Sequence, residues 1–363
     1  MAHTAQKYNK ENPFLTDLLV NIKLNKEGSQ KDTRHFEIKL KEDEINYLPG
    51  DALYVCPEND PNLVKELLSL ITLEHSQEAE FTRFTKEINI TRASNKLFKL
   101  IEDKSSGAHK AAELTEKFNG YNLVNIIKSF SDIQFTSNEI AENSSKLQAR
   151  AYSIASSMRA HPNQVDLCIA RVDEEINGQK ILGVCSNYLS SRVDLNSTNL
   201  RVYVHVNEKF RLPADKKTNI IMVGPGTGIA PFRAFIEERN CDRDAGEQVG
   251  KDWLFFGDQR AAYDYLYQEE LESYKSKYGL EITTAFSRDQ AEKVYVQNRM
   301  KENSKQIFDW LENGAHFYVC GDARRMAKDV DLALHEIIRE NGKDAEAYIK
   351  NLKETNRYSR DVY

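Results

Sequence analysis

The feature that most constrains the fold is a glycine-rich segment between a short apolar run and a helical pattern. Residues 224–228 have the sequence Gly-Pro-Gly-Thr-Gly, after the strand-like run 220–223 and before the amphipathic stretch 232–239. Glycines at such a junction let the backbone approach a pyrophosphate, and the first helical turn offers free N–H groups and a favourable dipole. The spacing differs from the usual G-x-G-x-x-G, so a glycine-rich turn without a ligand is the alternative interpretation. The segment predicts a dinucleotide site that contains Gly226, Thr227 and Gly228.

From residue 213 onwards, short apolar runs alternate with amphipathic segments. Helical spacing separates most of the apolar runs, which are 220–223, 253–256, 282–285 and 317–320. Strand–helix repetition at this spacing is typical of a parallel sheet covered by helices. We therefore expect an α/β domain over residues 216–363, with the domain boundary near residues 213–218.

The N-terminal part instead alternates apolar and polar residues, as half-buried antiparallel strands require. This alternation occurs in the runs 20–24, 36–40, 165–169 and 202–206. Between these runs, apolar residues recur at helical spacing, and Asp60 followed by Pro61 is typical of a helix start. We expect residues 1–215 to form a small antiparallel β-barrel domain, with a helical insertion at about 61–142.

Composition and length argue against several classes of protein. The chain has 363 residues, enough for two or three domains, and a formal net charge of only −6, which argues against nucleic-acid or membrane binding. No run of about 18 apolar residues occurs, and residues 1–11 have no apolar core like that of a secretory signal. The cysteines lie far apart without nearby histidines, which argues against disulfides and a metal site. We expect a cytoplasmic protein without a bound metal.

Residues after the second and third parallel strands bear on which nucleotide binds. A carboxylate after the second strand favours NAD, whereas basic groups accept the 2′-phosphate of NADP. The second strand is followed by Gly257-Asp258-Gln259-Arg260, which is ambiguous. The third precedes Ser287-Arg288 and Lys293-Val294-Tyr295-Val296-Gln297, whose hydroxyl, cations and ring suit a phosphorylated ribose and its adenine. Alone, this segment would be interpreted as a solvated basic loop; beside the glycine segment, it favours NADPH.

Three further places carry residues suited to redox chemistry. Arg150-Ala151-Tyr152-Ser153 is strand-like, and its cation, ring and hydroxyl suit a flavin nucleotide, although an exposed strand is an equal alternative. Cys320 ends the last clear parallel strand, where open α/β sheets bind ligands, yet a lone cysteine there is more often a small buried residue. The terminal Tyr363 would be a frayed end in most proteins.

Together these segments resemble the ferredoxin–NADP⁺ reductase-like FAD/NADPH module of diflavin reductases. The resemblance covers about residues 8–363, and the helical insertion resembles the connecting domain of that group. Within the group, the chain is most similar to the flavoprotein (alpha) subunit of NADPH-sulfite reductase. The motifs occur in the family's order and are 150–153 (RAYS), 183–186 (GVCS), 224–228 (GPGTG), 287–288 (SR), 293–297 (KVYVQ), 320–322 (CGD) and 358–363 (YSRDVY).

The resemblance implies an FAD site in the N-terminal domain. Arg150, next to Ala151, would contact the pyrophosphate, and Tyr152 would stack on one face of the isoalloxazine. The other implied FAD contacts are Ser153 near N5, Cys168, Ile169 and Ala170 beside the flavin, Gly183, Val184, Cys185 and Ser186 at the pyrophosphate, and Tyr363 over the other flavin face. Two positions depart from the family: Glu174 replaces a tyrosine that often contacts FAD, and the adenine-side contact falls near Arg92 or Ala93.

The resemblance also implies an NADPH site and a path for hydride. Thr227, between Gly226 and Gly228, would meet the NADPH pyrophosphate. The residues implied at the adenosine 2′-phosphate end are Ser287, Arg288, Lys293, Tyr295 and Gln297, with Val294 and Val296 in the same run and Asp329 as a further contact. Ser153, Cys320 and Asp361 would surround the path from nicotinamide C4 to flavin N5.

The implied function is that of an NADPH-dependent reductase, with hydride transfer to FAD and then single electrons to a partner. That partner would be a flavodoxin-like FMN protein or the sulfite reductase haemoprotein. A ferredoxin or flavodoxin reductase shares every motif and stays open, and a non-catalytic subunit that has lost its flavin is the alternative from another class. Because diflavin reductases carry an FMN domain before this module, we expect either a stand-alone reductase or the reductase half of a longer protein.

Overall fold

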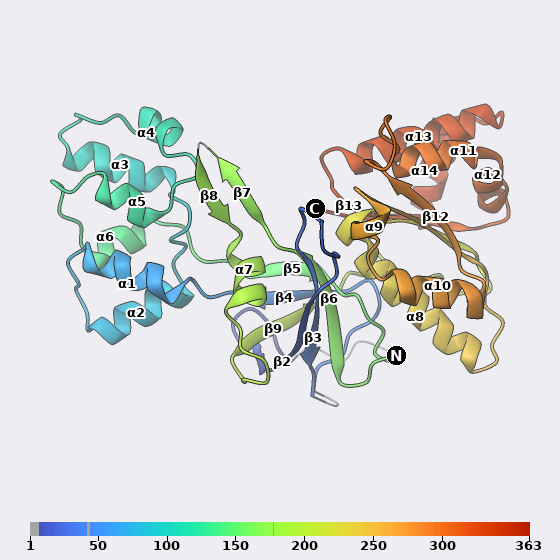
Figure 1. The fold of residues 1–363 in the computed structure, drawn as a ribbon, viewed down its shortest axis with the longest axis horizontal. Coiled ribbons are helices and arrows are strands. Elements are labelled where there is room, and N and C mark those ends of the chain that lie inside the picture. The colour runs from blue at the N-terminus through green and yellow to red at the C-terminus, as the bar shows by residue number, and fades with distance from the viewer. Residues whose placement is uncertain (1–6, 42–43, 177) are drawn as a thin grey trace. The chain divides into compact units, whose positions relative to one another are not determined.

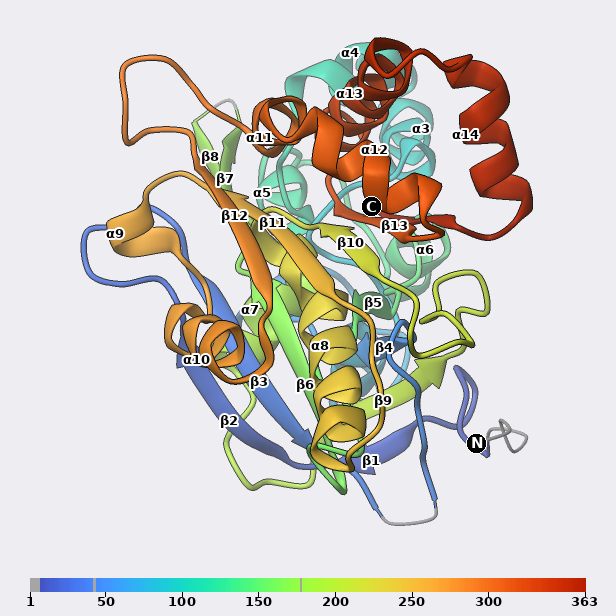
Figure 2. The ribbon, with the colours of Figure 1, turned by 90° about the vertical axis from the view of Figure 1, so that its right-hand side faces the viewer.

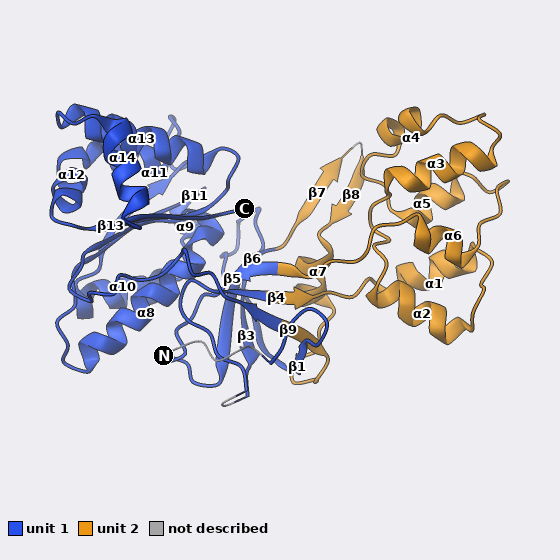
Figure 3. Ribbon diagram, turned by 180° about the vertical axis from the view of Figure 1, so that it is seen from behind, with its two compact units in different colours: residues 1–53, 151–170, 203–363 blue, residues 54–150, 171–202 orange. Residues whose placement is uncertain are grey.

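The computed structural model describes residues 7–41, 44–176 and 178–363, and Figure 1 labels its elements. The described residues form two compact units, which Figure 3 colours separately. Unit 1 comprises residues 1–53, 151–170 and 203–363, and unit 2 comprises residues 54–150 and 171–202. The predicted boundary near residues 213–218 follows the change in strand and helix pattern rather than compactness, and it stays a prediction.

A five-stranded parallel sheet forms the C-terminal part of unit 1 and confirms the predicted α/β architecture. The strand order is β12-β11-β10-β13-β14, so the strand before the glycine segment lies at the centre. The strands are β10 (Ile220–Val223), β11 (Asp252–Asp258), β12 (Glu281–Phe286), β13 (His316–Gly321) and β14 (Tyr358–Val362). The last of these was not predicted as a strand, because it has no apolar run of its own.

Residues of these strands face two separate cores. On one face, strand residues such as Ile221 and Phe317 pack against α11 (Val296–Glu302), α12 (Ser304–Glu312), α13 (Met326–Glu340) and α14 (Ala345–Glu354). On the other, residues such as Met222 and Phe256 pack against α8 (Ala230–Asp244) and α10 (Gln268–Tyr278), with the short α9 (Ala261–Asp264) nearby in sequence. Figure 2 shows these two helical layers on either side of the sheet. Burial of each large apolar side chain stabilises the fold by about 1.5–3 kcal/mol.

Unit 1 also contains the antiparallel sheet β2-β3-β6. Its strands are β2 (Leu18–Lys23), β3 (Thr33–Lys39) and β6 (Gln164–Ala170), and Phe36 of the central strand pairs with Asn21 on one side and Leu167 on the other. A further four-stranded sheet has the order β1-β9-β4-β5, with β1 (Phe14–Thr16), β4 (Ala52–Cys56), β5 (Arg150–Ser153) and β9 (Leu200–His205). These sheets confirm the predicted antiparallel part.

The antiparallel and parallel parts of unit 1 share one hydrophobic core. Ala155, Cys168 and Phe210 from the antiparallel part belong to the same cluster of buried residues as Phe232 and Phe235 of α8. The Phe210 ring lies 5.5 Å from that of Phe235, centroid to centroid. This shared core holds the two sheets of unit 1 together.

Unit 2 is mainly helical. Its helices are α1 (Pro61–Ser69), α2 (Gln77–Lys86), α3 (Asn95–Lys104), α4 (Ala111–Lys117), α5 (Leu123–Lys128), α6 (Ser137–Glu142) and α7 (Val184–Ser191). Asp60 caps α1 as predicted, since its carboxylate accepts a hydrogen bond of 2.8 Å from the N–H of Asn62. The hairpin β7 (Asp173–Ile176) and β8 (Gln179–Leu182) was not predicted, because its residues are mostly exposed and show no apolar face. No helix in the described ranges is long and apolar enough to cross a membrane.

The turn at Gly50 lies where the chain enters β4, and it requires glycine. Gly50 has a φ of +96°, and a Cβ at this position would lie 1.8 Å from the carbonyl oxygen of Phe210. The next residue, Asp51, is fully buried, and its carboxylate accepts hydrogen bonds from the N–H groups of Leu48 at 2.8 Å and Asn207 at 2.9 Å. A side chain at residue 50 would therefore push apart two segments that Asp51 holds together.

We expect Gly50→Ala to lower the free energy of unfolding by at least about 2 kcal/mol, because backbone strain and a backbone clash add together. Gly246→Ala is the matched control, since Gly246 has a φ of +80° but nothing lies within 4 Å of an added Cβ. That variant should lose only the strain contribution of about 1 kcal/mol. Urea unfolding of both variants measures the difference, and equal losses would contradict the clash.

Candidate functional site

The glycine segment packs directly on strand β13. It continues β10 into the 3₁₀ turn Gly226–Ile229 and then into α8. A Cβ on Gly228 would lie 2.2 Å from the carbonyl oxygen of Cys320, and Gly226 has a φ of +57°. Only glycine at residue 228 allows this approach, so the segment lies flat against the carboxyl end of β13. This is the backbone arrangement that the sequence predicted for a pyrophosphate loop.

A cavity of about 490 Å³ opens beside the glycine segment, at the carboxyl ends of the parallel strands. It brings together most of the residues predicted at the NADPH site, namely Gly226, Ser287, Arg288, Lys293, Tyr295, Val296, Gln297 and Asp329. Three other predicted residues do not line it. Gly228 lies against Cys320, Val294 packs on the core beneath α11, and the Thr227 hydroxyl bonds that of Tyr363 at 2.8 Å.

The basic side of this cavity is held by backbone hydrogen bonds between neighbouring strand ends. The N–H groups of Ser287 and Arg288 donate to the carbonyl oxygens of Asp258 at 2.9 Å and Gln259 at 2.8 Å. Tyr295 is the N-cap of α11 and is exposed. One rim of the cavity thus carries a hydroxyl, a guanidinium, an ammonium and an aromatic ring. This combination suits a phosphorylated ribose with an adjoining purine.

The cavity also contains residues that the sequence did not assign to it, of which Lys31 and Asp258 are the most informative. Lys31 precedes β3, and its Nζ lies 2.5 Å from Oδ1 of Asp258 at the end of β11. Burial raises the pKa of the Asp258 carboxyl, and the charge of Lys31 opposes that rise. The other oxygen of Asp258 is buried and has no hydrogen-bond partner among the described residues. No local signal marks this pair, because 227 positions separate its members.

Ser153, Cys320 and Asp361 come together at the same edge of the sheet. The Ser153 hydroxyl donates to Oδ2 of Asp361 at 2.5 Å, and the Cys320 sulfur lies 4.0 Å from the same oxygen. Cys320 and Asp361 are register partners in the parallel strands β13 and β14. Burial raises the pKa of Asp361 and raises that of the Cys320 thiol well above its usual value, so the thiol is neutral at physiological pH.

The residues predicted at the flavin are divided between the two units. In unit 1, Tyr152 and Ser153 lie in β5, and Cys168, Ile169 and Ala170 end β6. Burial raises the pKa of the Cys168 thiol to about 12, and its side chain belongs to the shared core. Tyr363 is 62% exposed, and its backbone N–H bonds the carbonyl of Gly321 at 3.1 Å.

In unit 2, Gly183 begins a helix that suits an anion. It is the N-cap of α7, and a Cβ there would lie 2.7 Å from the side chains of Val172 and Ser186. The N–H of Val172 donates to the Ser186 hydroxyl at 3.1 Å, which fixes the first turn of the helix. Val184, Cys185 and Ser186 form that turn, and Arg150, Glu174 and Arg92 are exposed.

Among the described residues, no group of three or more His, Cys, Asp or Glu could hold a metal ion.

Comparison with known protein families shows to which family the chain belongs. The FAD binding domain family matches residues 6–91 and 87–188, and the oxidoreductase NAD-binding domain family matches residues 222–331. The chain belongs to the FAD-binding domain family. Its antiparallel sheets followed by a five-stranded parallel sheet have the ferredoxin–NADP⁺ reductase-like fold, and the two matches support FAD and NADP as its cofactors.

Curated relatives of this FAD-binding protein are sulfite reductase [NADPH] flavoprotein alpha-components. That of Bacillus subtilis (strain 168) is 39% identical over 384 residues, and that of Escherichia coli (strain K12) is 40% identical over 388 residues. That of Mannheimia succiniciproducens is 39% identical over 379 residues. These alignments cover 98–99% of this chain but only 62% of each relative. The chain therefore spans about 62% of the length of these relatives.

The residues of this FAD-binding protein fit a phosphorylated dinucleotide. The approach of Gly228 to β13 leaves no room for a side chain, and Gly226 opens directly onto the cavity. Ser287, Arg288 and Lys293 provide a hydroxyl and two cations on the rim of the same cavity. A pyrophosphate requires that the backbone approach it closely, and a 2′-phosphate requires cations and hydrogen-bond donors around it.

We expect Lys31→Met to raise the pKa of Asp258 further, because it removes the cation that opposes burial. The pKa of this carboxyl is higher in the folded protein than in the unfolded chain, where it is about 3.9. Its protonated form therefore stabilises the fold below about pH 3.9, and this stabilisation is lost as the pH rises through the folded pKa. The variant should therefore lose about 1–2 kcal/mol of unfolding free energy relative to the native chain near pH 7. Carboxyl-carbon NMR measures the titration, and denaturant unfolding against pH measures the stability.

Lys26→Met is the matched control, since the exposed Lys26 donates a hydrogen bond of 3.0 Å to the uncharged Gln268 side chain. Asp258→Asn in the Lys31→Met background should remove the pH dependence of the loss. An unchanged titration of Asp258 in Lys31→Met would contradict the pairing.

Proposed function

We propose that this protein oxidises NADPH and passes the electrons singly, through FAD, to a separate acceptor protein. The observation that carries the proposal is that the nucleotide cavity and the Ser153–Cys320–Asp361 cluster occupy one edge of the same sheet. Asp322 lines the cavity, two residues after Cys320. A dinucleotide bound by its phosphates at the glycine segment would thus have the buried Cys320 and the half-buried Ser153 and Asp361 beside it.

The phosphates would be held by the glycine segment and the basic rim. Thr227 and the backbone of Gly226 would meet the pyrophosphate, and Ser287, Arg288 and Lys293 would bind the 2′-phosphate. Tyr295, exposed at the start of α11, would stack on adenine, while Gln297 and Asp329 would close the ribose side. Charge-assisted hydrogen bonds to the 2′-phosphate would give the preference for NADPH over NADH.

The cluster at the end of β13 would define where hydride moves. When bound, FAD supplies the chemistry that accepts a hydride and releases electrons one at a time. The Ser153 hydroxyl would alternate between two hydrogen bonds, one donated near the flavin N5 and one donated to Asp361. The neutral thiol of Cys320 would line the nicotinamide path without adding charge. Tyr363 would cover the flavin face and move aside for the nicotinamide.

The remaining residues implied at the flavin would hold its pyrophosphate and its ring. Arg150 and the first turn of α7, with Gly183, Val184, Cys185 and Ser186, would hold the FAD pyrophosphate. Tyr152 would stack on the isoalloxazine, and Cys168, Ile169 and Ala170 would line it, with Cys168 contributing its backbone because its side chain is in the core. Residues 1–215 would thus be the FAD domain and residues 216–363 the NADP domain.

The proposed acceptor is a flavodoxin-like FMN protein or the haemoprotein of sulfite reductase. Support comes from the relatives, which are named as flavoprotein components of an NADPH-dependent sulfite reductase. The proposed location is the cytoplasm, because the cysteines Cys56, Cys168, Cys185, Cys241 and Cys320 are free thiols.

Ferricyanide reduction by the purified, FAD-loaded protein tests the proposal, with NADPH compared to NADH. We expect strong NADPH-dependent reduction. Parallel reactions with flavodoxin, ferredoxin and sulfite reductase haemoprotein then identify the acceptor, and preference for ferredoxin or flavodoxin alone would favour a general reductase. Failure to bind FAD or to reduce ferricyanide would favour a non-catalytic subunit instead.

We expect Arg288→Ala to weaken NADPH binding by about 2–3 kcal/mol and to leave NADH binding unchanged, because charge-assisted hydrogen bonds to the 2′-phosphate are lost. Calorimetric titration with NADP⁺ and NAD⁺ measures both affinities. Arg339→Ala is the control, since Arg339 lies on α13 and pairs with the exposed Glu346 at 3.5 Å. Equal losses for both nucleotides would contradict the assignment.

We expect Tyr363→Ala to raise NADH turnover and so relax the preference for NADPH, because uncovering the flavin face eases nicotinamide access. Tyr363→Phe keeps the ring but loses the hydrogen bond to Thr227, and it should retain the native preference. Steady-state kinetics with both nucleotides compare the variants. NADH turnover that stays at the native level in Tyr363→Ala would argue against a covering role.

A further inference from the structure

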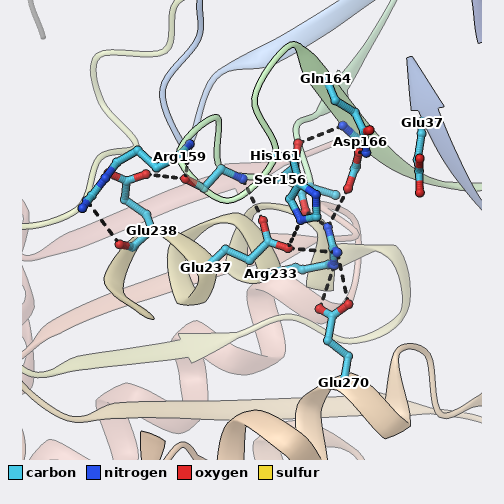
Figure 4. A network of polar contacts seen from close by, with 12 residues as sticks. Glu37, Ser156, Arg159, His161, Gln164, Asp166, Arg233, Glu237, Glu238 and Glu270 are labelled. Carbon is cyan, nitrogen blue, oxygen red and sulfur yellow. Dashed lines mark hydrogen bonds and ion pairs between the residues drawn. The ribbon is translucent and has the colours of Figure 1, made fainter. Parts of the chain in front are cut away.

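Arg233 lies at the centre of a buried polar network in unit 1, shown in Figure 4. It belongs to α8, the helix that begins directly after the glycine segment, and its side chain is 6% exposed. Its Nη1 donates to the carbonyl oxygen of Ala155 at 2.6 Å and to Asp166 at 2.9 Å. Its Nε lies 2.8 Å from Glu270, and its Nη2 lies 2.9 Å from Glu237. One guanidinium thus uses all three of its nitrogens.

The partners of Arg233 belong to two different parts of unit 1. Glu237 lies on α8 and Glu270 on α10, both packed on the parallel sheet. Ala155 and Asp166 belong to the antiparallel part, where Ala155 follows Ser153 by two residues and Asp166 precedes Cys168 by two. Arg233 therefore links the helix behind the nucleotide loop to both strands that carry proposed flavin contacts.

The two strand partners of Arg233 are themselves joined. The N–H of Ala155 donates to the carbonyl oxygen of Asp166 at 2.8 Å, so the segment that follows β5 is bonded directly to the middle of β6. On its other side, the guanidinium lies 5.1 Å from the centre of the Tyr267 ring, whose hydroxyl is 3.0 Å from Nδ1 of His35. His35 lies in β3, so the Arg233 side chain is linked to β3 and β6 of the antiparallel sheet and to the segment that follows β5.

Only arginine suits this position. Three carboxylates from Asp166, Glu237 and Glu270 surround one cation, and each is reached from a different direction. The planar fork of a guanidinium presents five donors, whereas a lysine ammonium is a single point with three. A lysine at residue 233 would keep the charge but release part of the linkage.

We propose that Arg233 is a positioning residue for hydride transfer. It fixes the strands that carry Ser153 and Cys168 against the helix that follows the nucleotide loop, and so sets the separation between nicotinamide and flavin. Hydride transfer requires the reacting atoms in a narrow range of distance, and a displacement of about 1 Å can slow such a step by about 100-fold. This inference rests on the proposed function.

Arg233→Lys, compared with Arg239→Lys, tests the inference. Arg239 lies on the same helix and is equally buried, at 3% side-chain exposure, and pairs with Asp252 at 2.6 Å. It also donates to the carbonyl oxygens of Lys216 at 3.3 Å, Thr218 at 3.0 Å and Gly250 at 2.9 Å, so none of these bonds reaches the antiparallel sheet. Both substitutions remove a buried guanidinium from α8, but only one touches the strands beside Ser153 and Cys168.

The first measurement is the rate at which flavin absorbance falls after mixing with saturating NADPH, with unlabelled and 4-deuterated nucleotide. We expect Arg233→Lys to slow this step by about tenfold or more and to express a larger isotope effect. Arg239→Lys should reduce flavin at the native rate. NADP⁺ affinity by calorimetry, and reoxidation of dithionite-reduced protein by ferricyanide, should be unchanged in both variants.

Asp166→Asn is the second variant, because it keeps the shape of the side chain and weakens one bond to Arg233. It should slow flavin reduction by a smaller factor than Arg233→Lys does. If Arg233→Lys fails to retain FAD, the rate of flavin reduction in Asp166→Asn tests the positioning role instead. Native rates in Arg233→Lys and Asp166→Asn, or equal slowing in Arg239→Lys, would overturn the positioning role. If the native protein itself fails to reduce its flavin with NADPH, the proposed function fails first.

Discussion

The contact between Gly228 and strand β13 is the constraint on which the rest of the site depends. The carbonyl oxygen of Cys320 occupies the place that any side chain at residue 228 would need, at 2.2 Å from an added Cβ. Because glycine leaves that space open, the nucleotide loop lies on the strand that carries Cys320. The cavity, the terminal strand β14 and the Tyr363 side chain consequently meet at one sheet edge. A loop held a few ångströms farther away would separate nucleotide recognition from the polar cluster.

Local sequence patterns, together with the residue types that follow the third parallel strand, were enough to predict the fold class and the rim of the nucleotide cavity. Apolar runs at strand spacing marked β10, β11, β12 and β13, and the alternation around Phe36 and Leu167 marked the antiparallel sheet. Ser287 and Arg288 were predictable because they directly follow β12, with Lys293 in the same loop, and the carboxyl ends of parallel strands share an edge. These patterns are local in the sequence, so they can be recognised without any knowledge of tertiary contacts.

The features that escaped prediction all depend on contacts between distant segments. Lys31 reaches Asp258 across 227 positions, and only the folded chain shows that the carboxylate at the end of β11 is paired with a cation. Strand β14 has polar residues at Ser359, Arg360 and Asp361, so it lacks an apolar signature and forms because β13 offers it an edge. Arg233 looked like one helical residue among others, since its partners on β6 and α10 are 67 and 37 positions away.

Cys320 illustrates how burial changes what a side chain does. Its thiol is fully buried, and desolvation together with the nearby Asp361 carboxylate raises its pKa well above the ordinary value. Alkylating agents and peroxides attack the thiolate rather than the thiol. A sulfur atom can therefore sit beside a redox cofactor, where oxidants are generated, and remain chemically inert. In the proposed mechanism, the burial that keeps the hydride path free of charge would also protect Cys320 from oxidants produced at the flavin.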